Sequence, residues 1–522
     1  MVRLKLEVFI SHFVANVIDQ KMKYYIQPIV NSLTSYGFEY NYKLKRNIRV
    51  PKYTYCVCHE IEGVYRFPID YLTYFLSTLG SQCALRRDEI EIINNSKVTY
   101  GDPIDVKFKE TFTPRPEQEQ YIKLLTENER DLRLVDLYTG GGKSLIGMNA
   151  VCRIGKRTAI IVLPKYMDKW AEDIVKYTYT SKDRILLVNG SDMLVHIMNN
   201  IEEYKKNYDF FIFSMRSISN YISVYADNPF NTYEFSKYPL PPEEFFTRLG
   251  IGTVLNDETH QEFYAFYRAM MYFTRDKTIC LTATLTSNDS YMLRIQQSLI
   301  PTKCRISGLV QQPKYIEANV IKYYIKTFGR NLGRVCERRK MYNHIMWEQF
   351  ILSNSILRSD FLEMILKYVK RDYLDRKTSG DKLLVFCAGV NMSKVIAQML
   401  ERELPKDLKI GTYIEEDKYE DALKLDVIVS TIISSSTAID YPNLITTIQT
   451  VSLDSKIANI QSLGRLRRLE GKTTIYDCIY CQDVPKQIGF NKTRVNILNE
   501  KCKSVEYEIY SRSVIDRELR MR

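Results

Sequence analysis

The sequence has no run of about 18 apolar residues, which is the length that a helix needs to cross a membrane. The apolar stretch at residues 8–14 is too short and too interrupted to indicate a signal peptide. We therefore expect a protein that neither spans a membrane nor is secreted, and that stays in the cytoplasm.

The 11 cysteines have no spacing typical of a disulfide framework, which favours a reducing compartment. Two short clusters, Cys56 to His59 and Cys478 to Cys481, each offer half of the ligands of a zinc site. The second cluster overlaps a strand-like run at residues 473–480, and no other pair lies near it in the sequence. Buried free thiols are the favoured interpretation, with a metal site as the alternative.

At 522 residues the chain is long enough for about three or four domains. Its 45% hydrophobic and 26% charged residues are ordinary for a globular protein. The net charge of +12 favours an anionic partner, although excess lysine is equally typical of a solvated surface.

Residues 137–144, Leu-Tyr-Thr-Gly-Gly-Gly-Lys-Ser, form the first motif that indicates a specific chemistry. They lie between a strand-like run at 132–137 and a helix-like run at 145–150. A glycine turn in this position presents backbone N–H groups and the helix dipole to a phosphate. A strict phosphate-binding loop has glycine in place of Leu137, so the match covers Thr139 to Ser144. Lys143 would lie beside the phosphate, and Ser144 would offer its hydroxyl to Mg²⁺.

A second motif, Asn-Asp-Glu-Thr-His at residues 256–260, follows a strand-like run at 252–255. Ligands of parallel sheets gather outside the carboxyl ends of strands, so both acids can address the same phosphate. Asp257 would hold Mg²⁺ through water, and Glu258 would orient and deprotonate the attacking water. A solvated turn is the alternative. After the next strand, Thr282 and Thr284 would bridge this site to another domain, or serve as ordinary turn residues.

Strand-like runs at 158–163, 185–188, 210–213 and 252–255 alternate with helix-like stretches, which predicts a parallel sheet covered on both faces. Residues 221–246, rich in Pro, Asn and aromatics, indicate an inserted loop. Residues 303–380 indicate a basic bridge with helices near 338–352 and 359–369. Strands at 382–387 and 426–431 follow it.

Residues 1–105 contain no nucleotide motif and indicate a small α+β module, with a helix expected at 69–79. Within it, residues 42–53 interleave cations with aromatics. Such a segment can bind phosphates while stacking on bases. A solvated hairpin edge protected by lysines is an equally good interpretation.

Two further stretches contain residues that could act at a nucleotide site. Gln118 would present its amide to adenine, because an amide both donates and accepts hydrogen bonds. Near the other end, Arg465 and Arg468 lie three residues apart, so on one helical turn they would share a face. An arginine-rich solvated helix is the alternative.

In this order the motifs resemble those of superfamily 2 helicases of the DEAD, DEAH and DExH types. Residues 115–118, 139–144, 257–260, 282–284 and 461–468 resemble the adenine-reading element and motifs I, II, III and VI. Residues 164–170 and 214–217 are similar to motifs Ia and Ib, 382–401 to motif IV and 438–442 to motif V. Ala438 stands where family members usually have glycine.

The resemblance implies an α/β fold with two tandem RecA-like P-loop domains. The expected domains are a nucleic-acid-binding α+β module at 1–105, an ATP-binding domain at 106–310, a second domain at 311–490 and a basic extension at 491–522. The implied cofactors are ATP and Mg²⁺. The nucleotide would lie between the two lobes.

The resemblance also implies a role for each site residue. The catalytic residues would be Lys143, Asp257, Glu258, Arg465 and Arg468, with Ser144 and Asp257 at the metal. The nucleotide would contact Arg115, Gln118, Thr139, Gly140, Gly141, Gly142, Lys143, Ser144, Asp440 and Gln461. Nucleic acid would contact Lys165, Ser214, Arg216 and Thr431, and His260, Thr282 and Thr284 would couple hydrolysis to movement.

The spacing of these motifs is most similar to the XPB and UvsW branch, which suggests branched DNA as substrate and a phage or viral source, hence a host cytoplasm. The expected partner is single-stranded or branched DNA. RNA or an RNA–DNA hybrid is the alternative, which would make the protein an RNA helicase. A double-stranded DNA translocase is a further alternative, although such motors usually carry a nuclease and residues after 485 form only a short basic end. A binding module without hydrolysis is disfavoured by the presence of Lys143, Glu258, Arg465 and Arg468.

Overall fold

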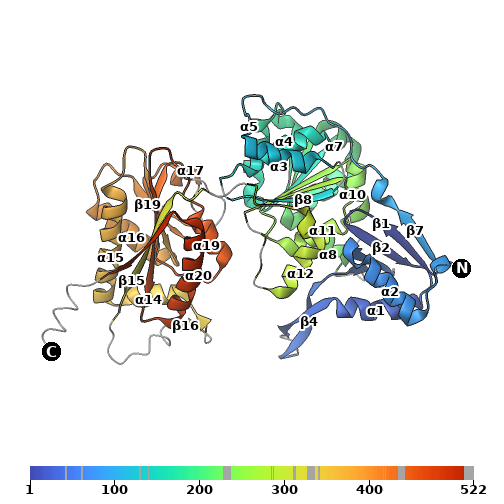
Figure 1. Cartoon of the computed structure of the whole chain (residues 1–522), viewed down its shortest axis with the longest axis horizontal. Helices are drawn as coiled ribbons and strands as arrows, with labels where there is room; N and C mark the ends of the chain where they lie inside the picture. The colour runs from blue at the N-terminus through green and yellow to red at the C-terminus, as the bar shows by residue number, and fades with distance from the viewer. Residues whose placement is uncertain are drawn as a thin grey trace. The chain divides into compact units, whose positions relative to one another are not determined.

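The computed structural model describes every residue except 42–43, 60–62, 129–130, 139, 227–236, 284, 286, 288, 310–312, 326–335, 339–340, 415–416, 418, 433–440 and 511–522. The chain forms two compact units, Met1–Gln311 and Gln312–Arg522 (Figure 1). In the described part of the chain, no helix combines the length and the apolar character that a membrane crossing requires.

The main body of unit 1 is a seven-stranded parallel sheet in the order β10-β11-β9-β12-β13-β8-β14. Its inner strands are nearly continuous runs of buried residues, as expected for a parallel sheet that is covered on both faces. The predicted parallel sheet is confirmed. The strands are β8 (Asp131–Asp136), β9 (Thr158–Val162), β10 (Ile185–Val188), β11 (Phe210–Ser214), β12 (Thr253–Asp257), β13 (Lys277–Thr282) and β14 (Arg305–Ile306).

Helices cover both faces of this sheet, with α3, α4 and α5 on one side and α8 and α11 on the other (Figure 1). The predicted inserted loop at residues 221–246 is wrong at both ends. Tyr221 and Ile222 are buried in α8, and Phe245 and Phe246 are buried in α10, because their aromatic and aliphatic side chains pack into the core. The helices are α3 (Pro116–Thr126), α4 (Lys143–Ile154), α5 (Met167–Tyr177), α6 (Ser191–Asn199), α7 (Ile201–Asn207), α8 (Met215–Ala226), α10 (Pro242–Leu249), α11 (Phe263–Met270) and α12 (Ser290–Leu299).

The N-terminal part of unit 1 is the expected small α+β module. Its five-stranded sheet has the order β5-β6-β2-β1-β7, and Phe13, Phe67 and Phe75 pack in its core. Among the described strands, β3 and β4 pair only with each other and form a separate hairpin. The elements are β1 (Leu4–Val8), β2 (His12–Val17), α1 (Met22–Ser32), β3 (Thr34–Asn41), β4 (Arg46–Thr54), β5 (Val57–His59), β6 (Val64–Pro68), α2 (Leu72–Cys83) and β7 (Ile90–Asn94).

Unit 2 repeats the parallel architecture, with seven strands in the order β19-β20-β18-β21-β22-β15-β23. In β18, Leu383 and Val385 face one core cluster while Leu384 and Phe386 face another, so both faces are buried. The strands are β15 (Ile316–Tyr323), β18 (Lys382–Cys387), β19 (Ile410–Tyr413), β20 (Val427–Thr431), β21 (Leu444–Gln449), β22 (Thr474–Cys481) and β23 (Ser504–Ile509), with the small pair β16 (Glu337–Arg338) and β17 (Met341–Tyr342).

Helices α14, α15 and α16 lie on one side of this sheet and α19 and α20 on the other (Figure 1). The predicted bridge at 303–380 overlooked β15, and the predicted extension from 491 overlooked the end of α20 and β23, which pairs with β15. Both cysteines of the 478–481 cluster are buried in β22. The helices are α14 (His344–Ser353), α15 (Ser355–Val369), a π-helix (Lys370–Leu374), α16 (Val390–Glu403), α17 (Tyr419–Ala422), α19 (Lys456–Leu463) and α20 (Pro485–Lys501).

Candidate active site

The glycine-rich loop connects β8 to α4 at the carboxyl edge of the unit 1 sheet. Gly140 and Gly142 both have φ of 90°, a conformation that residues with a Cβ rarely adopt. Gly142 is the N-cap of α4 and offers no side-chain cap, so the N–H groups of the first turn are available to an anion. The loop therefore has the backbone form of a phosphate cradle; Thr139 lies outside the described residues.

Lys143 is the first residue of α4, and its ammonium lies between the loop and the acidic motif. Nζ donates to the carbonyl oxygen of Leu137 at 3.4 Å and lies 3.9 Å from Oε1 of Glu258. A bound phosphate would compete with Glu258 for this ammonium, because both are anions. The arrangement places a cation and a carboxylate at one phosphate position.

Asp257 is the last residue of β12, and both of its carboxylate oxygens accept hydrogen bonds. Oδ1 accepts the backbone N–H of Glu258 at 2.9 Å, and Oδ2 accepts the indole N–H of Trp170 at 3.1 Å. Glu258 itself has φ of 50°, in the left-handed region that costs a non-glycine residue roughly 1–2 kcal/mol. Such strain is common where a side chain must point at a reacting group.

His260 connects the acidic motif to the end of β13. Its Nδ1 lies 2.9 Å from Oγ1 of Thr282 and 3.3 Å from Oε2 of Glu258. Burial, and then the nearby charge of Lys143, lower the pKa of His260 to about 4, so its ring is neutral at pH 7. The structure thus brings together the two predicted coupling residues that it describes; Thr284 lies outside the described residues.

Asp173, on α5, is an acid that sequence reasoning missed. Its carboxyl interacts with the side chain of Ser144, and burial is the main cause that raises its pKa. Its Oδ2 is buried and has no hydrogen-bond partner in the described structure. The only signal in the sequence is its position three residues after Trp170, which places both side chains on one helical face.

The site fits a metal that is held largely by the nucleotide. The described residues contain no group of three or more His, Cys, Asp or Glu side chains arranged as metal ligands. Ser144 and Asp257 supply oxygen atoms from two adjacent elements, and Mg²⁺ typically takes one or two protein oxygens together with phosphates and water. The donor set therefore matches Mg²⁺ bound with a nucleotide.

Gln118 and Arg115, the predicted adenine contacts, are bonded to the glycine loop. The Gln118 side chain is only 5% exposed, and its Nε2 donates to the carbonyl oxygen of Gly141 at 3.0 Å. Its Oε1 accepts the backbone N–H of Arg115 at 2.9 Å, and the Arg115 guanidinium donates to the same Gly141 oxygen at 3.4 Å. The two residues thus support the loop from the start of α3.

The predicted nucleic-acid contacts of unit 1 follow the carboxyl ends of two neighbouring strands. Lys165 follows β9 and lies 5.1 Å from the ring centroid of Tyr166. Ser214 ends β11 with its hydroxyl buried and without a partner in the described structure, and Arg216 is exposed in α8. Because β9 lies between β11 and β12 in the sheet, these residues are on the same edge as the acidic motif.

The predicted residues of unit 2 have mixed outcomes. Helix α19 ends at Leu463, so the prediction that Arg465 and Arg468 share a helical face is wrong. They lie in the segment after α19, where Arg465 is 4% exposed and Arg468 is exposed. Gln461 is in α19 and Thr431 is buried at the end of β20. Asp440 lies outside the described residues.

The part of the chain that carries the glycine loop and the acidic motif is similar to known proteins. The family model described as "Type III restriction enzyme, res subunit" matches residues 111–287. The Arabidopsis thaliana protein "General transcription and DNA repair factor IIH helicase/translocase subunit XPB2" is 24% identical over 380 residues, which cover 71% of this chain. The match spans only 45% of that relative's length.

One solved structure supports the fold. The DEAD-box helicase Mss116, bound to ssRNA and UDP-BeF, superposes with a TM-score of 0.50 at 15% identity, over 77% of this chain and 76% of that chain. T4 UvsW matches with a TM-score of 0.34 at 13% identity, over 98% of this chain and 100% of that chain. The glycine loop and acidic motif on one edge of a parallel sheet, the second such sheet in unit 2 and these matches together support an assignment to superfamily 2 of the helicases.

Proposed function

We propose that this protein is an ATP-dependent motor that remodels branched DNA, such as forks, displacement loops, Holliday junctions and R-loops, in replication, recombination or repair. The observation that supports it most is the meeting of Lys143 and Glu258, 3.9 Å apart beneath an uncapped helix N-terminus. A cation, a carboxylate and open N–H groups at one point match the needs of phosphoryl transfer to water.

In the proposed reaction, ATP binds with its phosphates on the N-terminus of α4 and on Lys143. Mg²⁺, held by Ser144 and Asp257, would neutralise phosphate charge. The bound phosphate would take the place of Glu258 beside Lys143. The Glu258 carboxylate would then orient and deprotonate the attacking water. His260 is neutral and hydrogen-bonded to Thr282, so a movement of Glu258 during hydrolysis would be transmitted through His260 to the end of β13.

We also propose that Arg465 and Arg468 of unit 2 act on the same nucleotide by neutralising charge that develops on the γ-phosphate. Their proposed role explains why hydrolysis would be coupled to movement of one unit against the other. Asp440 and Gln461 are proposed to contact the nucleotide from unit 2.

Nucleic acid is proposed to contact Lys165, Ser214, Arg216 and Thr431. Hydroxyl and cationic groups of this kind bind phosphates and carry little sequence information, so the motor would select structure rather than sequence. The name of the XPB relative, a DNA repair factor subunit, supports DNA.

A comparison of ATPase stimulation tests the substrate. We expect forked and junction DNA to stimulate hydrolysis and to be unwound or branch-migrated more than single-stranded DNA, blunt duplex or RNA of equal length. Stronger stimulation by RNA would instead identify an RNA helicase. Translocation along blunt duplex without strand separation would identify a double-stranded DNA translocase.

Glu258→Gln tests the catalytic assignment. The amide keeps the size of the side chain but removes the base, so we expect kcat to fall by a factor of about 10² or more while a fluorescent ATP analogue still binds. Glu172→Gln, which changes an exposed acid on α5, is the matched control and should leave kcat unchanged. Normal hydrolysis by Glu258→Gln would contradict the assignment.

A further inference from the structure

The β3–β4 hairpin is the one two-stranded ribbon of the described N-terminal module that joins neither large sheet (Figure 1). Its strands reach away from the five-stranded sheet, and no other strand in the described part of the chain pairs with them. Isolated ribbons of this kind are marginally stable in water, so the contacts at its base and the chemistry of its faces decide what it can do.

One face of the hairpin carries aromatic rings and a guanidinium. Residues paired directly across two antiparallel strands have their side chains on the same face. The register pairs Tyr36 with Pro51, Phe38 with Arg49 and Tyr40 with Asn47. Phe38 is 76% exposed and Tyr40 is 51% exposed. The Arg49 guanidinium carbon lies 3.9 Å from the ring centroid of Tyr36.

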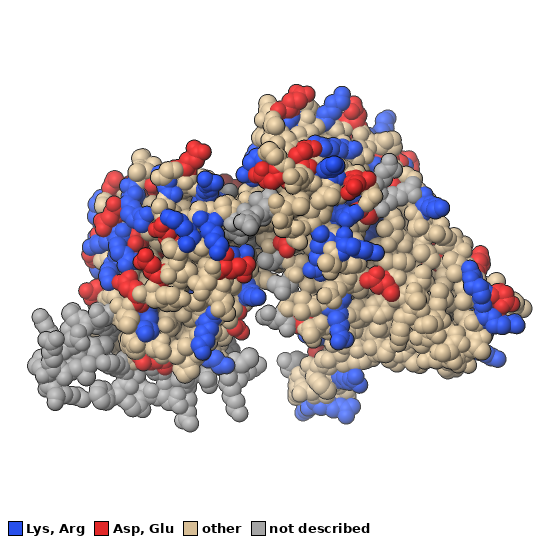
Figure 2. All heavy atoms as spheres, in the orientation of Figure 1, with Lys and Arg blue, Asp and Glu red and all other residues tan. Residues whose placement is uncertain are grey.

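The hairpin is also strongly cationic. Residues 34–54 contain five lysines and arginines and a single acid, Glu39. Figure 2 shows blue side chains gathered on this projection, in the lower middle of the view. A patch that combines exposed rings with this charge is complementary to a polyanion that exposes aromatic faces, and an unpaired nucleic-acid strand has both properties.

The base of the hairpin is attached to the helices that follow the nucleotide motifs. The backbone N–H of Thr54 donates to the hydroxyl of Tyr264 on α11 at 2.9 Å. Lys52 forms an ion pair of 2.8 Å with Asp289, which caps α12. Helix α11 begins three residues after His260, so a ligand on the hairpin is connected mechanically to the acidic motif.

We propose that the Tyr36–Phe38–Tyr40 face of this hairpin binds the unpaired bases of a single strand, which stack on Phe38 and Tyr40 while Arg49 contacts the phosphates. The inference rests on the proposed function, because it locates the strand on which the motor acts. Alternate residues of a strand are about 7 Å apart. This is about twice the 3.4 Å separation of stacked bases. One unpaired base therefore fits between two neighbouring rings of the hairpin, whereas the continuous base stack of a duplex does not.

Phe38→Trp supplies a direct test in the full-length protein. Both native tryptophans, Trp170 and Trp347, are buried, so the new indole will be the exposed emitter. With a non-hydrolysable ATP analogue and an oligothymidine of about 16 nucleotides, we expect base stacking to quench this emission at saturation. Tyr24→Trp, at an 82% exposed aromatic on α1, is the matched control and should not be quenched.

Affinity provides the second measurement. In fluorescence anisotropy, we expect Phe38→Ala with Tyr40→Ala to raise the Kd for the oligothymidine by a factor of roughly five or more, because stacking is lost at two positions. Binding to a blunt duplex should change less, and Tyr24→Ala should bind both as the native chain does. Arg49→Ala should weaken binding and reduce its dependence on salt.

The outcomes separate this inference from the proposed function. Native affinity in the double variant, together with unchanged Phe38→Trp emission, would overturn the hairpin assignment if the native chain still binds and hydrolyses ATP. A shift from dimer to monomer in sedimentation of the double variant would also overturn it, because the face would then belong to a second copy. A native chain that neither binds nucleic acid nor hydrolyses ATP would refute the proposed function itself.

Discussion

At the scale of single residues, the Trp170–Asp257 hydrogen bond is the contact that most affects the chemistry of the site. The indole is fully buried and its N–H has one acceptor, Oδ2 of Asp257. A fixed donor on one oxygen determines which lone pairs remain for Mg²⁺ or its water. Trp170 is therefore a positioning residue, which acts through Asp257 rather than on the substrate.

Trp170→Phe should raise the Mg²⁺ concentration needed for half-maximal nucleotide binding by roughly tenfold, because a hydrogen bond to a charged group contributes about 1.5–3 kcal/mol. The measurement is a Mg²⁺ titration of fluorescent-nucleotide binding, with thermal unfolding as a check on folding. Trp347→Phe makes the same change at a buried tryptophan of unit 2 and should leave the titration unchanged. Equal Mg²⁺ curves for the native chain and Trp170→Phe would show that the contact is only structural.

How much of the site the sequence predicts depends on how each residue reaches it. Lys143 and Glu258 were predictable because each belongs to a contiguous motif whose spacing is set by a strand followed by a turn. Asp173 was not, because its approach to Ser144 depends on how α5 packs beside α4, which no local pattern encodes. The bond from Gln118 to the glycine loop was unpredictable for the same reason.

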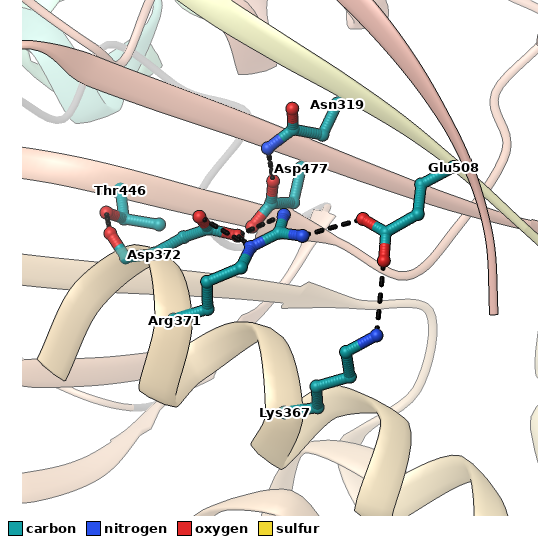
Figure 3. Close-up of polar contacts among 7 residues, drawn as sticks. All are labelled: Asn319, Lys367, Arg371, Asp372, Thr446, Asp477 and Glu508. Atoms are coloured by element: carbon teal, nitrogen blue, oxygen red, sulfur yellow. Dashed lines mark hydrogen bonds and ion pairs between the residues drawn. The ribbon is translucent and has the colours of Figure 1, made fainter. Parts of the chain in front are cut away.

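At the scale of elements, a cluster of acidic and polar side chains joins the π-helix of unit 2 to strands β15, β22 and β23 (Figure 3). Asp477 of β22 is fully buried, and Nδ2 of Asn319 on β15 donates to it at 2.7 Å. Burial, and then the neighbouring carboxylate of Asp372, raise the pKa of Asp477 well above its ordinary value. Arg371 joins Asp372 to Glu508 of the edge strand β23.

Asp477→Asn should make the stability of unit 2 less sensitive to a rise in pH from 4 to 8. The raised pKa means that the folded state holds a proton that the unfolded state has lost, so native stability falls as pH rises from about 4 toward the folded pKa. Each unit of separation between the two pKa values contributes about 1.4 kcal/mol. Asparagine carries no proton to lose and still accepts from Asn319, so the variant should be the more stable form at pH 8.

Denaturant unfolding between pH 4 and pH 8 measures this effect. We expect the unfolding free energies of the two forms to converge near pH 4 and to separate as pH rises. Asp407→Asn changes an exposed acid of unit 2, and its unfolding free energy should vary with pH as that of the native chain does. A profile for Asp477→Asn that is parallel to the native one would contradict the raised pKa.

The elements also show where sequence patterns fail. Strand β15 alternates apolar and polar residues in a charged region, and its burial comes from β22 and β23 on either side. Residues that are far away in the sequence therefore decide its state. Helix α19 likewise ends at Leu463, although the spacing of the arginines that follow suggests that it continues. Continuously buried strands such as β9 and β20 were predictable, because their own apolar composition suffices.

At the scale of the whole molecule, the proposed catalytic groups are divided between the two units. Lys143, Asp257 and Glu258 belong to unit 1, whereas Arg465 and Arg468 belong to unit 2. Nucleotide binding should therefore depend mainly on unit 1, and hydrolysis on both. Arg468 is the better residue to test, because it is exposed while the buried Arg465 also packs within unit 2.

Arg468→Ala should lower kcat by a factor of about 10³ while the Kd for a fluorescent ATP analogue changes little, because an arginine of this kind stabilises charge that develops only in the transition state. Arg402→Ala, at an exposed arginine of α16, is the matched control for loss of one positive charge from unit 2 and should keep the native kcat. Arg468→Lys should recover little activity, because an ammonium lacks the planar fork of donors. If Arg468→Ala instead weakens nucleotide binding and leaves kcat unchanged, the residue binds the ground state, and coupling between the units must depend on other groups.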